Sequence, residues 1–468
     1  MNGFTRHGLG RRGFLRSLAA GTVLVPALAS RMATETAGGA VGGLAARPPL
    51  KAPKAKRVIF LYMSGGVSHV ESWDPKPALM RDHGKTVSVD EFQGRKGDFK
   101  MFAKRPQWAF RPHGRCGTEV SELFPHMAGC VDEMCVIRSM VSDHTNHYEA
   151  TLGIHTGSFT FARPSLGSWV SYGLGTENRN LPSFVVIAPR NPYAGGQVWA
   201  SDFLPAEHQG TLVVPGAEPV ANLRPRVVPG RQEAELEALA RMNRRHLGLR
   251  ADDPALAARM RSFETAFGMQ MEMPDVFDLS RETDATLRLY GLERGSTKGF
   301  AWQCLVARRL AERGVRFVEL IDVGSSDNWD AHGDMETHRP LARNVDQAIA
   351  GLLRDLRSRG MLDDTLVVWT TEFGRTPFNA AADAKGREHH HWVFSSWLAG
   401  AGVRAGSVHG SSDEHGIRPA RDRVHVHDFH ATILHLMGMD HELLTFRHAG
   451  RDFRLTDVAG EVVKGVLA

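Results

Sequence analysis

Arg57-Val58-Ile59-Phe60-Leu61-Tyr62-Met63, followed at once by Ser64-Gly65-Gly66, is the stretch that decides the fold class. Its consecutive apolar residues have the length of a strand, which is typical of a strand buried on both faces of a parallel sheet. Four similar runs cover residues 183–187, 315–321, 365–370 and 394–398. Helical periodicity over residues 299–313 and 344–359 separates some of these runs, and each helix stops at a glycine. The alternation predicts an α/β fold, a three-layer sandwich with a mostly parallel central sheet.

Two stretches depart from this alternation. Residues 75–120 are polar and basic with scattered Gly and Pro, and we expect a loop-rich insertion there. Residues 231–290 carry charged helical patterns without strands between them, which predicts a helical insertion. Both insertions belong to one large domain, residues 57–468. Four cysteines in 468 residues exclude a disulfide-stapled scaffold.

The N-terminus has the composition of an export signal. Residues 1–29 hold four arginines and no acid, then an apolar run, and end on Ala27-Leu28-Ala29, a small-x-small cleavage site. Arg11-Arg12-Gly13-Phe14-Leu15-Arg16 resembles the twin-arginine signal, so we expect the twin-arginine export machinery as a partner and a periplasmic or cell-surface location. The run is too short for a stable membrane span, so none is expected after cleavage. Residues 30–56, rich in Gly, Ala and Pro, predict a flexible tether.

The positive net charge comes from this N-terminal region. The whole chain has 57 basic and 52 acidic residues, and residues 1–57 hold ten of the former and one of the latter. The remainder therefore carries 47 basic and 51 acidic residues, a net charge of −4. Because nucleic-acid binding requires a basic face, no nucleic-acid partner is expected.

Chemistry-bearing side chains gather after the predicted strands. Ligands of open parallel sheets bind at the carboxyl ends of the strands, which makes these turns the place to look. Acids, histidines and hydroxyls occur there in residues 64–69, 324–332 and 370–375, and a fourth such segment, residues 386–392, lies just before the predicted strand 394–398. Asp, Glu and His are the ligand set of Zn²⁺ and similar ions, so the sequence indicates a metal site.

The motifs in these segments resemble those of a known family. The specific pieces are Ile59 to His69, Trp73-Asp74-Pro75, His155-Thr156-Gly157, Arg163-Pro164-Ser165, Asn328-Trp329-Asp330-Ala331-His332, Thr371-Glu372-Phe373-Gly374-Arg375, Gly386-Arg387-Glu388-His389-His390 and Val424 to Leu434. Together they resemble the export-signal-bearing, sulfatase-like branch of the alkaline-phosphatase superfamily, a family named for its unknown function. The resemblance implies an alkaline-phosphatase-like sandwich and metal-assisted transfer or hydrolysis of phosphate or sulfate esters. It also implies a hydroxyl nucleophile at a helix N-terminus beside one or two metal ions.

The sequence departs from that pattern at the nucleophile. The position nine residues before the Thr156-Gly157 pair is His147, and Thr145 is the better of the nearby hydroxyls. His147 itself could ligate a metal or accept a phosphoryl group. Cys304 lacks the following proline of a sulfatase motif, so a formylglycine sulfatase is not expected.

The metal ligands that the resemblance implies also differ in part. One site would use Asp330, His332 and one of His389, His390 and His391, with a slight preference for His390. The first-strand Asp is replaced by Ser64, and the late Asp-His pair is replaced by Glu372-Phe373. A second site would therefore be rebuilt around Glu372 and His147, with His69 as a further member.

Arg375 follows Glu372 at a strand end, where a guanidinium suits bidentate contact with the oxyanion of a substrate.

These observations predict an exported metal-dependent hydrolase of phosphate or sulfate esters. Either a metal-activated water or Thr145 is the nucleophile, Arg375 holds the anionic group, and the substrate is a small-molecule or glycan ester. Zinc is the expected metal, with calcium or manganese as alternatives. The alternative function is a noncatalytic binding protein that keeps the fold and holds an anionic glycan or a cell-wall component.

Overall fold

The computed structural model of the chain describes residues 44–224, 229–249, 254–323 and 328–468. The predicted export signal, residues 1–29, lies outside the described residues.

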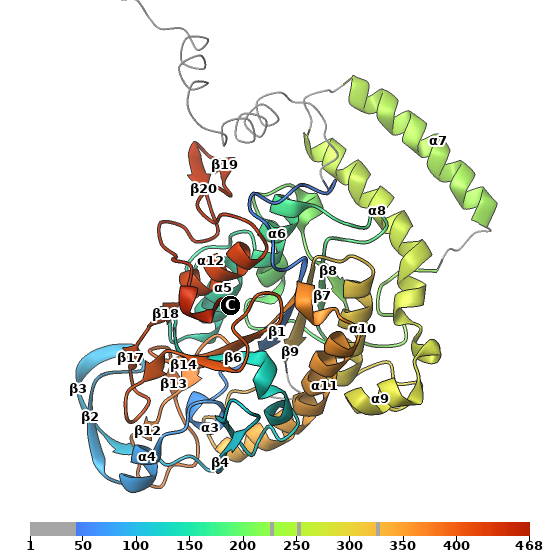
Figure 1. Cartoon of the computed structure of the whole chain (residues 1–468). Helices are drawn as coiled ribbons and strands as arrows, with labels where there is room; N and C mark the ends of the chain where they lie inside the picture. Colours follow the sequence, from blue (N-terminus) through green and yellow to red (C-terminus); the bar gives the residue numbers. More distant parts are fainter. Residues whose placement is uncertain (1–43, 225–228, 250–253, 324–327) are drawn as a thin grey trace, which may run out of the picture. The chain divides into compact units, whose positions relative to one another are not determined.

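Within the described residues, nine strands form one central sheet (Figure 1). In spatial order the strands are β15 (Ser407–His409), β6 (Met134–Val141), β14 (Phe394–Ala399), β10 (Thr365–Thr370), β1 (Arg57–Met63), β9 (Phe317–Asp322), β7 (Phe184–Ile187) and β8 (Thr211–Val213), with β18 (Val424–His425) beside β6. The strands from β10 to β8 are parallel, and β14 is antiparallel to both of its neighbours. The mostly parallel sheet predicted from the apolar runs is confirmed.

Helices cover both faces of this sheet because successive side chains of a strand point to opposite faces. In β1, Ile59 and Leu61 belong to one hydrophobic core, and Val58 and Phe60 belong to the other. The first core includes residues of α10 (Phe300–Glu312) and α11 (His338–Ser358), and the second those of α5 (His147–Thr156), α6 (Leu166–Leu174) and α12 (Val426–Leu436). The chain is therefore a three-layer α/β sandwich, as predicted.

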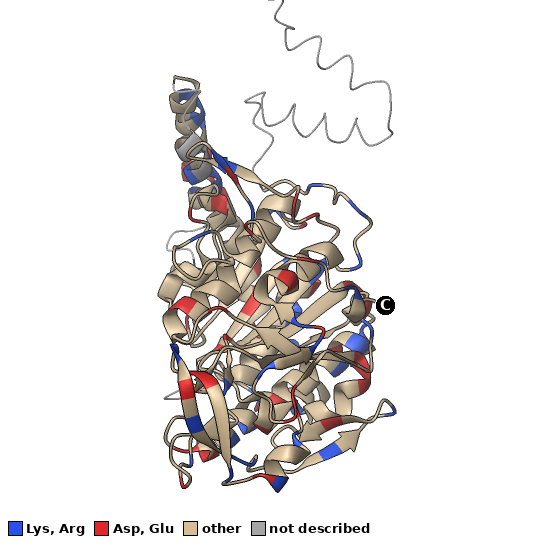
Figure 2. Ribbon diagram, turned by 90° about the vertical axis from the view of Figure 1, so that its left-hand side faces the viewer, with Lys and Arg blue, Asp and Glu red and all other residues tan. Residues whose placement is uncertain are grey.

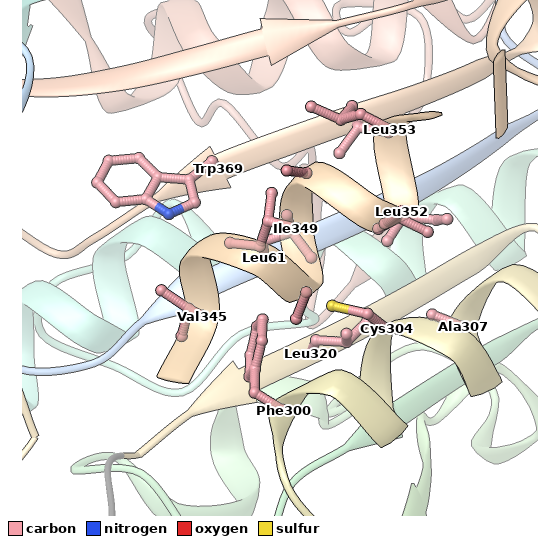
Figure 3. Close-up of a cluster of buried hydrophobic side chains, with 14 of the residues drawn as sticks. Leu61, Phe300, Cys304, Ala307, Leu320, Val345, Ile349, Leu352, Leu353 and Trp369 are labelled. Atoms are coloured by element: carbon pink, nitrogen blue, oxygen red, sulfur yellow. The ribbon is translucent and has the colours of Figure 1, made fainter. Parts of the chain in front are cut away.

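Figure 3 shows part of the first core. Leu61, Leu320 and Trp369 come from three neighbouring strands, and Phe300 and Ile349 reach them from α10 and α11. Figure 2 shows that the central strands are mostly free of charge, whereas acidic and basic residues lie on the outer helices and hairpins. Both observations fit strands that are buried on both faces.

The first insertion contains β-hairpins where the sequence predicts loops. The strands are β2 (Thr86–Phe92) with β3 (Arg95–Ala103), and β4 (Phe110–His113) with β5 (Thr118–Ser121), after the short α3 (His69–Ser72) and α4 (Pro77–Arg81). Gln93 and Gly94 join β2 to β3 with φ values of 51° and 74°, the two-residue turn that suits a hairpin. Val89 and Met101 pack with Phe378 of β12 (Phe378–Asn379), which gives the hairpin a small core.

The second insertion is helical in its described part. It consists of α7 (Pro229–Gly248), α8 (Pro254–Phe277) and α9 (Asp284–Tyr290). α7 lies alongside α8 at the edge of the domain (Figure 1). Among the described residues, no helix combines the length and the hydropathy needed to cross a bilayer.

Residues 44–56, which belong to the predicted tether, lie against the folded body. The backbone N–H of Arg47 donates to the carbonyl of Leu174 at 2.9 Å, and that of Lys54 donates to the carbonyl of Leu436 at 2.9 Å. Lys51 forms an ion pair of 3.0 Å with Asp440. Residues 44–56 are therefore held by ordered partners, which satisfy their backbone groups, and residues 30–43 of the predicted tether lie outside the described residues.

Candidate metal centre

Side chains from separate segments meet where the central strands end. Asp330 and His332 follow β9, and Glu372 follows β10. His389 lies in β13 (His389–His390), which pairs with β11 (Gly374–Arg375). His147 is the first residue of α5, which begins after β6. The carboxyl ends of parallel strands thus position the groups, as the sequence indicates.

Four of these side chains form a compact group of possible metal ligands. One ligand atom each from His147, Asp330, His332 and His389 lies within 4.8 Å of all the others. Asp330 Oδ2 is 3.3 Å from His147 Nε2, and Asp330 Oδ1 is 3.0 Å from His332 Nε2 and 3.5 Å from His389 Nε2. Around a tetrahedral ion with bonds of about 2.0–2.1 Å, ligand atoms lie roughly 3.3 Å apart. The group has the size of a tetrahedral metal site.

Each of the three imidazoles is held through its other nitrogen. His147 Nδ1 is 2.7 Å from Glu372 Oε1, and His332 Nδ1 is 2.8 Å from Glu388 Oε2. His389 Nδ1 is 2.7 Å from the backbone carbonyl of Thr145. All three partners are acceptors, so each Nδ1 carries a proton, and Nε2 is the ring nitrogen that a metal ion would bind in place of any proton. This is the arrangement by which outer groups orient metal-ligating histidines.

The inward-facing nitrogens crowd around Asp330 and one another. His147 Nε2 is buried and lies 3.3 Å from Asp330 Oδ2. His332 Nε2 and His389 Nε2 are 2.8 Å apart, and two lone pairs at that distance repel unless a proton or cation lies between them. Three imidazoles and one carboxylate suit zinc better than calcium, which prefers oxygen ligands. The residues present therefore fit a divalent metal of the zinc type.

The electrostatics of the group follow from its carboxylates. Burial opposes charge on Asp330, but the three adjacent histidines and Arg375 outweigh it and hold the pKa of this carboxyl well below its usual range. Hydrogen bonds to Asp330 and Glu388 raise the pKa of His332 to about 9. Burial lowers the pKa of His389. The group thus concentrates negative charge on Asp330, which is where a cation would gain most.

The sequence predicts Glu372 as a metal ligand, but its carboxylate instead contacts Nδ1 of the candidate ligand His147. It is fully buried and accepts hydrogen bonds from Tyr62 Oη at 2.9 Å and from the backbone N–H of Gly65 at 2.8 Å, in addition to its contact with His147. Burial raises the pKa of Glu372, but His147 and Tyr62 outweigh this and lower it. Its oxygens are therefore occupied by donors, and its carboxylate stays ionised behind His147.

Arg375 does not fit the predicted contact with a substrate oxyanion. Its side chain is fully buried, and it donates to the carbonyls of Gly65, Gly66 and Arg387. Its remaining contact is with Asp330 Oδ1 at 2.5 Å. Because backbone carbonyls and Asp330 engage all of its guanidinium nitrogens, Arg375 acts as a positioning residue for Asp330.

Of the three consecutive histidines, only His389 joins the group. His390 Nε2 lies 2.8 Å from the carbonyl of Ile417, and its ring stacks on His69. His391 Nε2 lies 3.8 Å from Glu91. Side chains alternate along β13, so the slight preference for His390 placed the ligand on the wrong face of the strand.

Thr145 contributes its carbonyl to His389, while its hydroxyl lies next to Gly94 of the β2–β3 turn. Sequence reasoning missed two rings that pack on His147. The Tyr193 ring stacks on it with centroids 4.2 Å apart and planes at 11°, and the Phe373 ring lies 4.8 Å away. Burial and the nearby Asp330 and Glu372 raise the pKa of Tyr193 to about 12. Tyr193 stands outside every motif, so no signal in the sequence points to it.

We compared the chain with models of protein families and with curated proteins. The model of a family described as "Protein of unknown function (DUF1501)" matches residues 55–467. A search of curated proteins found no match.

Several solved structures overlap with the chain. Among them are the PsFucS1 sulfatase from Pseudoalteromonas sp. (14% identity over 90% of this chain and 72% of that chain, TM-score 0.35), the lipoteichoic acid synthase LtaP from Listeria monocytogenes (9%, 91% and 80%, TM-score 0.36) and the alkaline phosphatase from the Antarctic bacterium TAB5 (11%, 84% and 99%, TM-score 0.33).

Proposed function

We propose that this chain, which belongs to the DUF1501 family, is a metal-dependent hydrolase of phosphate or sulfate esters. One observation carries the proposal: the Nε2 atoms of His147, His332 and His389 converge on Asp330 while acceptors hold each Nδ1. Three histidines and a carboxylate are ligands that a single zinc ion accepts. The ester class comes from the motifs that resemble the sulfatase-like branch of the alkaline-phosphatase superfamily.

A divalent metal held by these four residues would need a fifth coordination position in order to polarise an ester oxygen and make water more acidic. The surrounding residues prepare that chemistry. Glu372 and Glu388 keep two imidazoles in the tautomer that leaves Nε2 free, and the Thr145 carbonyl does the same for His389. Arg375 fixes Asp330 through its 2.5 Å contact. Since the Thr145 carbonyl is engaged and its hydroxyl lies next to Gly94, we favour water over Thr145 as the nucleophile.

Metal analysis combined with assays tests this function. The purified chain should carry about one equivalent of divalent metal by inductively coupled plasma mass spectrometry. It should hydrolyse at least one of three probes, a phosphate monoester, a phosphate diester and a sulfate ester. A chelator should abolish that activity and added zinc should restore it. Metal-free protein that is inert on all three classes after zinc addition would refute the hydrolase.

The second candidate function is a metal-dependent binding protein without turnover. The full engagement of Arg375 supports it, because that guanidinium is not available to stabilise developing charge on a transferred group. Such a protein would bind metal and retain an anionic glycan or cell-wall component unchanged. Zinc-dependent ligand binding without product formation would identify this function.

We also propose that the chain is exported through the twin-arginine pathway, which delivers folded proteins. Arg11 and Arg12 at the head of an apolar run support this proposal. A folded passenger suits a centre whose ligands come from segments as far apart in the sequence as His147 and His389.

A further inference from the structure

The exposed apolar side chains of the chain gather on α7 and α8, the helices at the edge of the domain. Among the described residues, eight leucine, methionine or phenylalanine residues are exposed. Five of them lie in these two helices or directly after α7: Leu239, Met242, Leu249, Phe263 and Met271. The other three lie elsewhere in the domain: Met80, Phe161 and Leu443. Single exposed apolar residues are ordinary on a protein surface, whereas a gathered set marks an interaction site.

α7 lacks a buried face. Of residues 230–249, none is buried. In Figure 1, α7 stands on the outer side of α8, against which it packs. A 20-residue helix is only marginally stable in water on its sequence alone, and helices in proteins owe most of their stability to packing of an apolar face. α7 therefore needs a further packing surface.

An open groove of about 330 Å³ lies between the two helices. Its apolar lining comes from three residues of α7 and three of α8: Leu236, Leu239, Ala240, Met260, Phe263 and Phe267. Leu239 is 46% exposed and Phe263 is 57% exposed, so solvent reaches the groove. A groove of this kind accepts the apolar face of another helix.

The charges of α7 divide at Leu239, the middle of the helix. Three acids and one arginine precede it: Arg231, Glu233, Glu235 and Glu237. Three arginines and no acid follow it: Arg241, Arg244 and Arg245. The first half therefore has a net charge of −2 and the second half of +3. The two ion pairs within α7 are exposed and contribute little to stability.

The groove has the charge that suits the second half of α7. Its lining includes three acids, Glu233 and Glu237 of α7 and Glu264 of α8. Two copies of α7 packed antiparallel bring the acidic half of each onto the basic half of the other, whereas parallel packing opposes like charges. The helix is thus complementary to itself in one direction only.

We propose that α7 and α8 form the interface of a homodimer, in which the groove of each copy receives α7 of the other. Two identical helices packed antiparallel obey two-fold symmetry, so Leu239 lies next to the axis and each attractive contact occurs twice. Two helices of about 30 Å by 10 Å cover roughly 600 Å² per copy, or roughly 1,200 Å² in total. This area is at the low end of specific interfaces, so we expect dissociation in the micromolar range. The inference does not depend on the metal centre.

Sedimentation velocity of the purified full chain at about 1–100 μM tests the dimer and should show a monomer–dimer equilibrium. Leu239→Lys should raise the dissociation constant at least about a hundredfold, because the apolar contact is lost from both copies. The matched control is Leu443→Lys, at a leucine that is 55% exposed outside the two helices. It should dimerise like the unaltered chain. A chain that stays monomeric at 100 μM refutes the proposal, and so does an equal effect of the two substitutions.

Exchanging charges tests the antiparallel arrangement. One double variant carries Glu233→Arg and Glu237→Arg, and the other carries Arg241→Glu and Arg244→Glu; the four positions share one face of α7. Each double variant alone should be monomeric, because like charges then oppose each other at both ends of the interface. An equimolar mixture should form a heterodimer, since opposite charges meet again, and this recovery also shows that both variants are folded. A mixture that stays monomeric overturns the proposal, as does either variant dimerising like the unaltered chain.

Discussion

Replacing Glu388 by Gln should weaken metal binding without unfolding the protein. Glu388 Oε2 lies 2.8 Å from His332 Nδ1, and the Glu388 side chain is 21% exposed. Its charge stands on the far side of the imidazole from the four ligand atoms. At roughly 7 Å, and with an effective dielectric constant between about 40 and 80 for a partly exposed path, a unit charge and a dication attract by about 1–2 kcal/mol. The zinc dissociation constant should therefore rise roughly five- to thirtyfold, which overlaps the range found when such outer groups are altered.

Competition with a chromophoric zinc chelator at pH 7 measures this change. Glu414→Gln is the control, because Glu414 is 80% exposed and its ion-pair partner is Arg81 at 3.9 Å. It removes the same charge and should leave zinc affinity unchanged. Both variants should unfold in urea like the unaltered chain when zinc is absent. Equal zinc affinity of Glu388→Gln and the unaltered chain would refute the role of Glu388 in orienting His332.

Three further predictions concern stability and export. Burial and the nearby Arg47 and Arg261 lower the pKa of His208 to about 3, against about 6.5 in an unfolded chain. The neutral His208 therefore favours the folded state fully above pH 6.5, and this contribution to the free energy of unfolding is lost as the pH falls towards 3. The free energy of unfolding, measured by urea titration at pH 7, 6 and 5, should therefore fall less steeply with decreasing pH in His208→Gln than in the unaltered chain, by up to about 1.4 kcal/mol per pH unit. An unchanged slope contradicts this. Arg387→Met should lower the free energy of unfolding by about 3–5 kcal/mol, because it leaves the fully buried Glu71 without its ion-pair partner at 2.7 Å. Adding Glu71→Met should recover most of the loss. An Arg387→Met variant as stable as the unaltered chain contradicts this. Changing both Arg11 and Arg12 to Lys should keep the precursor inside the cell in fractionation experiments, and normal export would exclude the twin-arginine route.

The parallel part of the sheet was predictable because its strands are continuous apolar runs. The run of residues 365–370 matches β10 (Thr365–Thr370) at both ends. The β2–β3 hairpin was missed, because most of its residues are at least partly exposed and its polar composition is typical of a loop. β6 (Met134–Val141) was missed as well. Arg138 interrupts its apolar run, and its sheet neighbours β14, β15 and β18 come much later in the chain.

The site was predictable in its position and only partly in its roles. Strand ends pointed to Asp330, His332 and the histidine run, because parallel strands bring their carboxyl ends together. Roles depend on the direction of each side chain, which the sequence leaves open. His389 and His390 are neighbours in β13 and face opposite sides. Arg375 and Glu372 have suitable chemistry, yet burial and satisfied hydrogen bonds make them supports for Asp330 and His147.

The most direct test of the metal centre is X-ray absorption fine structure at the K-edge of the metal in the purified chain. We predict scattering from three imidazole rings and one carboxylate, the ligands from His147, His332, His389 and Asp330. The bonds between the metal and these ligand atoms should be about 2.0–2.2 Å long. A spectrum with sulfur neighbours, or with fewer than three imidazoles, would contradict this ligand set, and so would a purified chain that takes up no zinc.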